Sequence, residues 1–167
     1  MECVKLQINL ISATNLTDSR SFFKTKVYAT VSVEGVEHRT PVDEHGKANP
    51  RWNFLTTFFI RKSGIKKNVN MLTIKLYSYR RGWPKDRYIG KVEVSLKELH
   101  GWKAGGGSKT LSFPVKSSRE SEGKLNFSYK IVNTATGGGD TPPCTSTICE
   151  IIFRVTLGSI FGFMGST

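Results

Sequence analysis

Residues that favour burial alternate with residues that favour water along eight segments of this chain. A period of two is typical of half-buried β-strands, because successive side chains of a strand point to opposite faces. Eight such segments in about 130 residues predict an all-β fold of two packed antiparallel sheets, a β-sandwich. The positions predicted to face inward are Val4, Leu6, Ile8 and Leu10; Val27, Ala29, Val31 and Val33; Val36 and His38; Trp52, Phe54, Thr56 and Phe58; Leu72, Ile74 and Leu76; Val92, Val94 and Leu96; Leu111, Phe113 and Val115; and Leu125, Phe127, Tyr129 and Ile131.

Turn residues separate these segments. Glu34 and Gly35 predict a hairpin, residues 46–50 a loop, Gly64 a basic connector, and the glycines at 105–107 a further loop. The segment SLKELHG, around Leu99, predicts a single helical turn. The predicted strands and turns end near residue 132, which we take as the end of the folded domain.

The composition changes after residue 132. Residues 133–147 are rich in Gly, Thr and Pro and are expected to form a flexible linker. Residues 148–167 form an apolar tail that is interrupted by Glu150 and Arg154, which leaves an uncharged stretch from 155 to 167. A bilayer-spanning helix needs about 20 apolar residues, so two interpretations stay open: a membrane anchor, or a loosely docked or disordered tail.

Positive charge dominates the predicted domain. The 167 residues include 25 Lys and Arg against 13 Asp and Glu, a net charge of +12. Residues 133–167 contribute −1 through Asp140, Glu150 and Arg154, so residues 1–132 carry +13. The length suits one domain. A field of this sign attracts polyanions, which include both nucleic acid and acidic membranes.

The three cysteines do not indicate a disulfide framework. Cys3, Cys144 and Cys149 are odd in number, and the first residues enter a strand pattern directly, without a secretory signal. The expectation is an intracellular protein with free thiols. Neither Cys144 nor Cys149 has a nearby Cys or His pair that would complete a zinc site.

Four ordered motifs resemble the C2 domain: NLISATNL, VYATVSVEG, KANPRWNF with Asn49, Pro50 and Trp52, and RYIGKVEVSL with Ile89 and Gly90. The resemblance covers residues 1 to about 132 and implies the C2 type of β-sandwich. The closing segment GKLNFSYKIV suggests the circularly permuted (type II) topology. The whole chain is most similar to small plant proteins with a single C2 domain, which implies a peripheral membrane regulator of stress and defence responses.

Calcium binding is not expected, although the C2 resemblance implies loops that often bind this ion through aspartates. Lys26, Ser78 and Arg80 stand at three of the five usual aspartate positions, and Asp18 and Asp86 remain. Calcium takes six to eight oxygen ligands, so too few are left. A residual site stays open in which Asp18 and Asp86 converge with Asp43 and Glu44. No cofactor is predicted.

Cations and aromatic residues in the same loops indicate a surface for anionic phospholipids. Fixed Lys and Arg can supply the positive charge that calcium supplies elsewhere, and Trp is favoured at bilayer interfaces. A solvated charge cluster with rings folded over the loop bases is the alternative. The predicted lipid-binding residues are Lys24, Lys26, Arg80, Arg81, Lys85, Arg87, Phe22, Phe23 and Trp83.

A second lipid site is implied by C2 domains that bind phosphoinositides on a sheet face. Tyr28 and Tyr77 match the aromatic positions, Arg39 approximates a basic position, and Lys75 is a further candidate. Thr30 departs from the pattern, which expects lysine there. Tyrosines on an outward face also form ordinary cross-strand packing pairs.

Other classes of function have less support. His38, His45 and His100 are isolated, with no spacing of nucleophile, base and acid, so no enzyme is predicted. The basic cluster RKSGIKK lacks any nucleic-acid-binding motif, and no nucleic-acid partner is expected.

The prediction is a non-catalytic, calcium-independent module that is cytoplasmic and peripheral at the inner face of the plasma membrane. It would act as a regulator or adaptor in stress and defence signalling, with anionic phospholipid and a membrane-associated protein as partners. A protein-interaction adaptor with little lipid binding, or a residual calcium-dependent lipid binder, are the alternatives.

Overall fold

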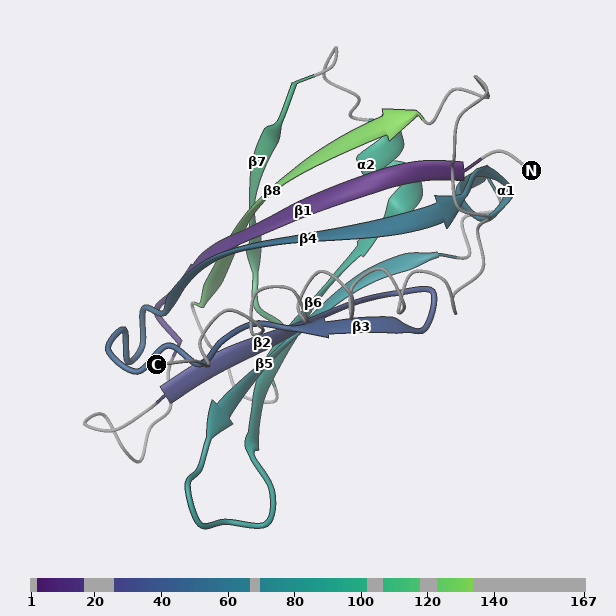
Figure 1. The fold of residues 1–167 in the computed structure, drawn as a ribbon. Coiled ribbons are helices and arrows are strands. Elements are labelled where there is room, and N and C mark those ends of the chain that lie inside the picture. Colours follow the sequence, from purple (N-terminus) through teal and green to yellow (C-terminus); the bar gives the residue numbers. More distant parts are fainter. Residues whose placement is uncertain (1–2, 17–25, 67–69, 102–106, 118–122, 134–167) are drawn as a thin grey trace, which may run out of the picture.

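The computed structural model describes residues 3–16, 26–66, 70–101, 107–117 and 123–133. These residues form the predicted β-sandwich (Figure 1). The strands are β1 (Cys3–Thr14), β2 (Lys26–Val33), β3 (Val36–Arg39), β4 (Arg51–Arg61), β5 (Met71–Tyr79), β6 (Arg87–Ser95), β7 (Lys109–Pro114) and β8 (Lys124–Asn133), and the helices are α1 (Lys62–Lys66) and α2 (Leu96–Gly101).

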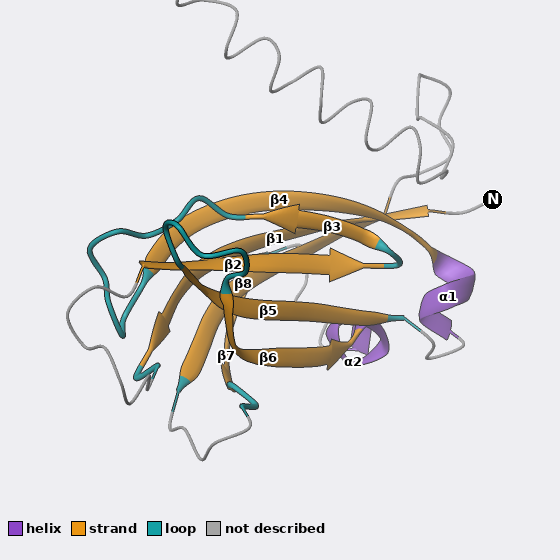
Figure 2. Cartoon of the chain, turned by 90° about the horizontal axis from the view of Figure 1, so that it is seen from below, coloured by secondary structure: helices purple, strands orange, loops and turns teal. Residues whose placement is uncertain are grey.

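Two four-stranded antiparallel sheets face each other. Sheet A has the strand order β4-β1-β8-β7, and sheet B has the order β3-β2-β5-β6. The last strand, β8, therefore lies in the middle of sheet A, beside β1 (Figure 2). The assignment to the permuted C2 topology, and the domain boundary at residue 132, stay predictions.

The predicted alternation places the hydrophobic core between the sheets. Val4, Leu6, Ile8 and Leu10 of β1 are almost completely buried, as are the inward positions of β2 and β5. Trp52, Phe54, Leu111, Phe113 and Ile131 are only partly buried and pack against this core from its margins. Each fully buried aliphatic or aromatic side chain contributes about 1.5–3 kcal/mol, so the alternation accounts for most of the drive to form this sandwich.

The loop from residue 40 to 50 is built around Asp43. Its Oδ1 accepts hydrogen bonds from the backbone N–H groups of His45 and Gly46 at 2.9 and 3.0 Å, and its Oδ2 accepts one from Arg51 N at 2.6 Å. A Cβ at Gly46 would lie 2.5 Å from that carboxylate and 2.6 Å from Asn49 O, so only glycine fits. Nearby, the indole N–H of Trp52 donates to Val27 O at 3.1 Å.

The turns were predicted more completely than the helices. Glu34 and Gly35 form the expected hairpin, with φ of 50° and 83°, and α2 is the expected helical turn at Leu99. Helix α1 was not predicted, because five residues are too few for a helical period and Gly64 disfavours a helix. A Cβ at Gly64 would lie 2.0 Å from Asn70 Nδ2, so a larger residue there would require the Asn70 side chain to shift.

The expectation of free thiols is wrong for Cys3, which is disulfide-bonded in the structure. Sequence spacing could not show this, because a disulfide depends on which cysteines the fold brings together. Cys144 and Cys149 lie outside the described residues, as do the predicted linker and apolar tail. Within the described ranges, no helix is long and apolar enough to cross a membrane.

Candidate functional site

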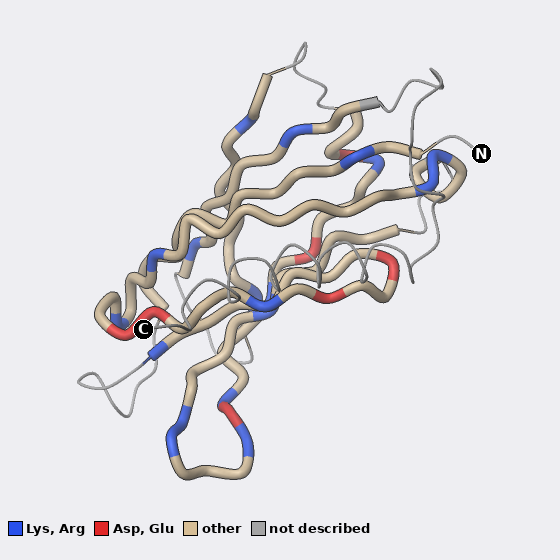
Figure 3. The backbone as a smooth tube through the Cα atoms, viewed as in Figure 1, with Lys and Arg blue, Asp and Glu red and all other residues tan. Residues whose placement is uncertain are grey.

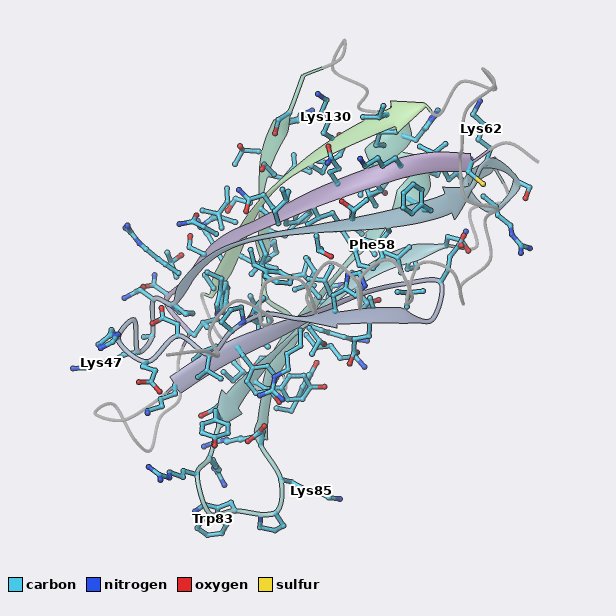
Figure 4. The ribbon with its side chains drawn as sticks, viewed as in Figure 1. Lys47, Phe58, Lys62, Trp83, Lys85 and Lys130 are labelled. Atoms are coloured by element: carbon cyan, nitrogen blue, oxygen red, sulfur yellow. The ribbon has the colours of Figure 1, made fainter. Side chains whose placement is uncertain are left out.

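A loop between β5 and β6 projects well beyond the sandwich (Figures 1 and 4). Arg81, Trp83 and Lys85 are exposed on it, and Trp83 retains 68% of its accessible surface. Arg80 and Arg87 lie at its two ends, so that basic residues line both arms (Figure 3). The structure thus brings together the predicted lipid-binding residues from 80 to 87, which we call the basic loop.

The basic loop is closed at its base by Asp86. Asp86 Oδ1 accepts a hydrogen bond from Arg80 N at 3.0 Å, and Asp86 Oδ2 accepts one from the Tyr28 hydroxyl at 2.8 Å. The Arg80 amide first, and the Tyr28 hydroxyl second, lower the pKa of Asp86. At the tip, Trp83 N donates to Arg80 O at 3.3 Å, and the Arg80 guanidinium carbon lies 5.6 Å from the Trp83 ring centroid.

Lys26 lies at the start of β2, and its charge is paired. Its Nζ lies 2.9 Å from Glu44 Oε1, and both side chains are substantially exposed. The hydrogen bond from Lys26 lowers the pKa of Glu44, which keeps the carboxylate ionised. Lys26 therefore offers less net charge to a ligand than its place beside the loops predicts.

Each described carboxylate that was considered for calcium already has an internal partner. Asp43 binds three backbone amides, Glu44 binds Lys26, and Asp86 binds Tyr28 and Arg80. Burial acts to raise the pKa of Asp43, but the hydrogen bonds from Arg51, His45 and Gly46 outweigh it and lower that pKa. Among the described residues, no group of three or more His, Cys, Asp or Glu could hold a metal ion. Asp18 lies outside those residues.

The outer face of sheet B carries two cross-strand rows, and Figure 2 views the molecule from this side. One row is Arg39, Thr30, Lys75 and Lys91, which are register partners on β3, β2, β5 and β6. The other row is aromatic, with Tyr28 stacked on Tyr77 at 5.4 Å and Tyr77 edge-on to Tyr88 at 5.7 Å. The four residues predicted for this face, Tyr28, Arg39, Lys75 and Tyr77, therefore lie together.

Contacts within this face restrain Tyr28 strongly. The Arg39 guanidinium carbon lies 3.7 Å from the Tyr28 ring centroid, a cation–π contact. Burial first, and the hydrogen bond to Asp86 second, raise the pKa of Tyr28 to about 12, so the hydroxyl stays a donor. Beside it, Thr30 is 6% exposed, and its Oγ1 has no hydrogen-bond partner among the described residues.

Sequence reasoning placed Thr30 on this face, as a departure from the expected lysine, but missed Tyr88 and Lys91. The period of two in RYIGKVEVS would have placed Lys91 on the outer face of β6, but the register to Lys75 is needed to see the row. Lys91 is also paired, with Nζ 2.8 Å from Glu93 Oε1. The first-loop residues predicted for lipid, Phe22, Phe23 and Lys24, lie outside the described residues.

The comparison with protein families decides the identity of the fold. Residues 4–120 match the model of the C2 domain. The chain belongs to the C2 domain family. A C2 domain of plant Extended Synaptotagmin 1 has the same fold, with a TM-score of 0.66 at 16% identity over 78% of this chain and 95% of that one.

Two curated plant relatives support this assignment. Protein SRC2 of Glycine max is 39% identical over 137 residues, which is 78% of this chain and 47% of SRC2. The Protein SRC2 homolog of Arabidopsis thaliana is 29% identical over 147 residues, 86% of this chain and 45% of the relative. The chain thus spans about half the length of these relatives. The predicted likeness to plant C2 proteins is confirmed; C2 domains commonly bind phospholipids and are generally non-catalytic.

Proposed function

We propose that this C2 domain attaches reversibly to anionic phospholipid membranes without calcium, through the basic loop. The observation that carries the proposal is the combination of exposed Arg81, Trp83 and Lys85 on one projecting loop with internal partners for the calcium-candidate carboxylates Asp43, Glu44 and Asp86. The first feature supplies permanent positive charge. The second removes ligands that a metal ion would need.

Calcium would also meet electrostatic opposition at this end of the molecule. Two like charges about 4 Å apart repel by about 4 kcal/mol at an effective dielectric constant of about 20. Lys26 and Arg80 stand at two of the usual ligand positions, and a divalent ion there would have to displace the Glu44 and Asp86 hydrogen bonds. Membrane binding therefore has to draw on the side chains themselves.

The loop cations supply enough energy for reversible attachment. Each Lys or Arg near an anionic surface contributes about 1 kcal/mol, so Arg80, Arg81 and Lys85 together contribute about 3 kcal/mol. Trp83, flanked by Gly82 and Pro84 at the tip, is placed to enter the interfacial region, where an indole ring is favoured. An attachment of this size is sensitive to salt.

The outer face of sheet B is proposed as a second contact, for a phosphorylated inositol headgroup. Arg39 and Lys75 flank Thr30 on the neighbouring strands, so two cations lie on one patch of this face. A phosphate oxygen is an acceptor to which both cations can donate. The neighbouring Tyr28 and Tyr77 rings form a flat wall beside it.

In the cell, the proposed role is a peripheral regulator or adaptor of stress and defence signalling at the inner face of the plasma membrane. The likeness to the plant SRC2 proteins supports this role, with a membrane-associated protein as partner. The basic charge of the domain favours the acidic cytoplasmic leaflet over a neutral surface.

Sedimentation of the full chain with vesicles tests the proposal. The chain should pellet with phosphatidylcholine–phosphatidylserine vesicles in the presence of EGTA, stay in solution with phosphatidylcholine alone, and respond little to added calcium. Competing RNA should not release it. Binding that requires calcium would favour the calcium-dependent alternative, and absence of binding under both conditions would favour a protein adaptor.

A further inference from the structure

Asp86 is the sole acidic residue of the basic loop, RRGWPKDR, yet its hydrogen bonds go to uncharged groups. Within the described part of the chain, neither of its oxygens forms an ion pair with Arg80, Arg81 or Lys85. One oxygen binds a backbone amide six residues earlier, and the other binds a hydroxyl on a different strand. The carboxylate therefore joins the two arms of the loop to each other and to β2.

Such a connection offsets the tendency of the loop to open. Like charges on the two arms repel each other, and an exposed loop loses conformational entropy when it is held in one shape. A carboxylate that accepts two hydrogen bonds holds both arms at their base, and charge-assisted bonds of this kind are stronger than neutral ones. Arg81 and Lys85 remain exposed, and the Lys85 side chain points away from the loop (Figure 4).

Tyr28 is suited to hold the other end of this connection. Its ring is 6% exposed and lies between the Arg39 guanidinium at 3.7 Å and the Tyr77 ring at 5.4 Å. The hydroxyl therefore has little freedom to turn away from Asp86. The register partner of Tyr28 on β5 is Tyr77, and β2 lies between β3 and β5. Tyr28 therefore belongs to an interior strand of sheet B and not to an edge strand.

We infer that Asp86 and Tyr28 are positioning residues for membrane binding: together they hold the basic loop in its binding conformation, a task for which the loop needs no metal ion. This inference rests on the proposed function of the loop. It assigns to Asp86, a residue kept as a calcium candidate on sequence grounds, a role in orienting the groups that contact lipid.

Two substitutions of Asp86 that change the charge equally separate positioning from electrostatics. Asp86→Ala removes both acceptors. Asp86→Asn removes the same charge but can still accept from Arg80 N and can donate to the Tyr28 oxygen. Loss of the negative charge alone should tighten binding to acidic vesicles by about fivefold in both variants. Positioning predicts that the alanine variant binds at least fivefold more weakly than the asparagine variant.

Tyr28→Phe provides a milder test that keeps the ring and its stacking. It should weaken binding two- to fivefold and should speed amide hydrogen exchange at Arg80. Tyr88→Phe is the matched control, because Tyr88 belongs to the same aromatic row and, among the described residues, its hydroxyl has no hydrogen bond. That variant should leave both measurements unchanged.

The measurements are binding of the full chain to phosphatidylcholine–phosphatidylserine vesicles in EGTA and amide exchange of residues 80–86 by NMR without lipid. If Asp86 only stabilised the fold, the Asp86→Ala variant would have a lower melting temperature, and its amide exchange would rise equally in the loop and in the core. Equal binding by the Asp86→Ala and Asp86→Asn variants would overturn the inference while leaving the proposed function intact. Failure of the wild-type chain to bind vesicles would instead overturn the proposed function, and the exchange data would still test whether Asp86 and Tyr28 hold the loop.

Discussion

Replacing Arg80, Arg81 and Lys85 with alanine should abolish most of the affinity for acidic vesicles. Arg81 and Lys85 are exposed, and Arg80 lies near the ring of the protruding Trp83, so all three can approach a membrane together. At about 1 kcal/mol for each cation, the loss is about 3 kcal/mol. Since about 1.4 kcal/mol corresponds to a tenfold change, the dissociation constant should rise roughly 100-fold.

A variant with the same change in net charge serves as the control. Lys62 and Lys130 lie far from Trp83 and Lys85 (Figure 4), and Lys5 lies on β1 of sheet A. Charges separated from the membrane by more than the Debye length of about 8–10 Å are largely screened, so Lys5, Lys62 and Lys130 replaced by alanine should weaken binding less than threefold.

Vesicle titrations at two salt concentrations measure both effects. The loop variant should lose most of the salt dependence, whereas the control should keep it. Equal losses in the two variants would refute the reasoning, because they would show that diffuse charge, and not the basic loop, makes the contact.

Three further predictions concern individual residues. Trp83→Ala should weaken vesicle binding about tenfold without lowering the melting temperature, because the ring is 68% exposed and belongs to no core; an unchanged affinity would show that the ring stays in water. Gly46→Ala should destabilise the fold by about 1–3 kcal/mol in urea unfolding, because the new Cβ would meet Asp43 and the backbone of Asn49 and Pro50; wild-type stability would contradict this. Half-burial lowers the pKa of His38 below its ordinary value of 6.5, so the unfolded chain binds the proton more readily than the folded chain. The free energy of unfolding should therefore be highest above pH 6.5 and should fall as the pH drops from 6.5 through the pKa of His38 in the folded chain. A His38→Gln variant, followed by its melting temperature from pH 7.5 to 5.5, should lose this slope, and a slope that persists would assign it to other groups.

Several features of the candidate site could be predicted from local sequence. The alternation in MLTIKLYSY and RYIGKVEVS predicted the two strands that flank the basic loop, and the resemblance predicted that Arg80, Arg81, Trp83 and Lys85 share one loop. The neighbourhood of Tyr28, Arg39, Lys75 and Tyr77 was predicted from the resemblance and depends on the register of three strands, β3, β2 and β5.

Other features depend on contacts that the sequence leaves open. The pairing of Lys26 with Glu44, and of Tyr28 with Asp86 58 residues away, changes which charges are available for lipid or metal. The disulfide bond of Cys3 was not predicted either, and α1 was missed because five residues are too few for a helical period. The two side-chain pairs and the disulfide bond arise when residues distant in the chain become neighbours, and no local period reports that.

Sequence alone determined the strands, the inward face of each strand and the excess of positive charge, because burial and charge are properties of single residues repeated at a fixed spacing. Tertiary structure decided the use of the charges. Asp43 and Asp86 became internal hydrogen-bond acceptors and Lys26 acquired a counter-ion, whereas Arg81 and Lys85 remained exposed. The physical reason is that a hydrogen bond or ion pair depends on distances of about 3 Å, which are set by strand register and loop closure and not by composition.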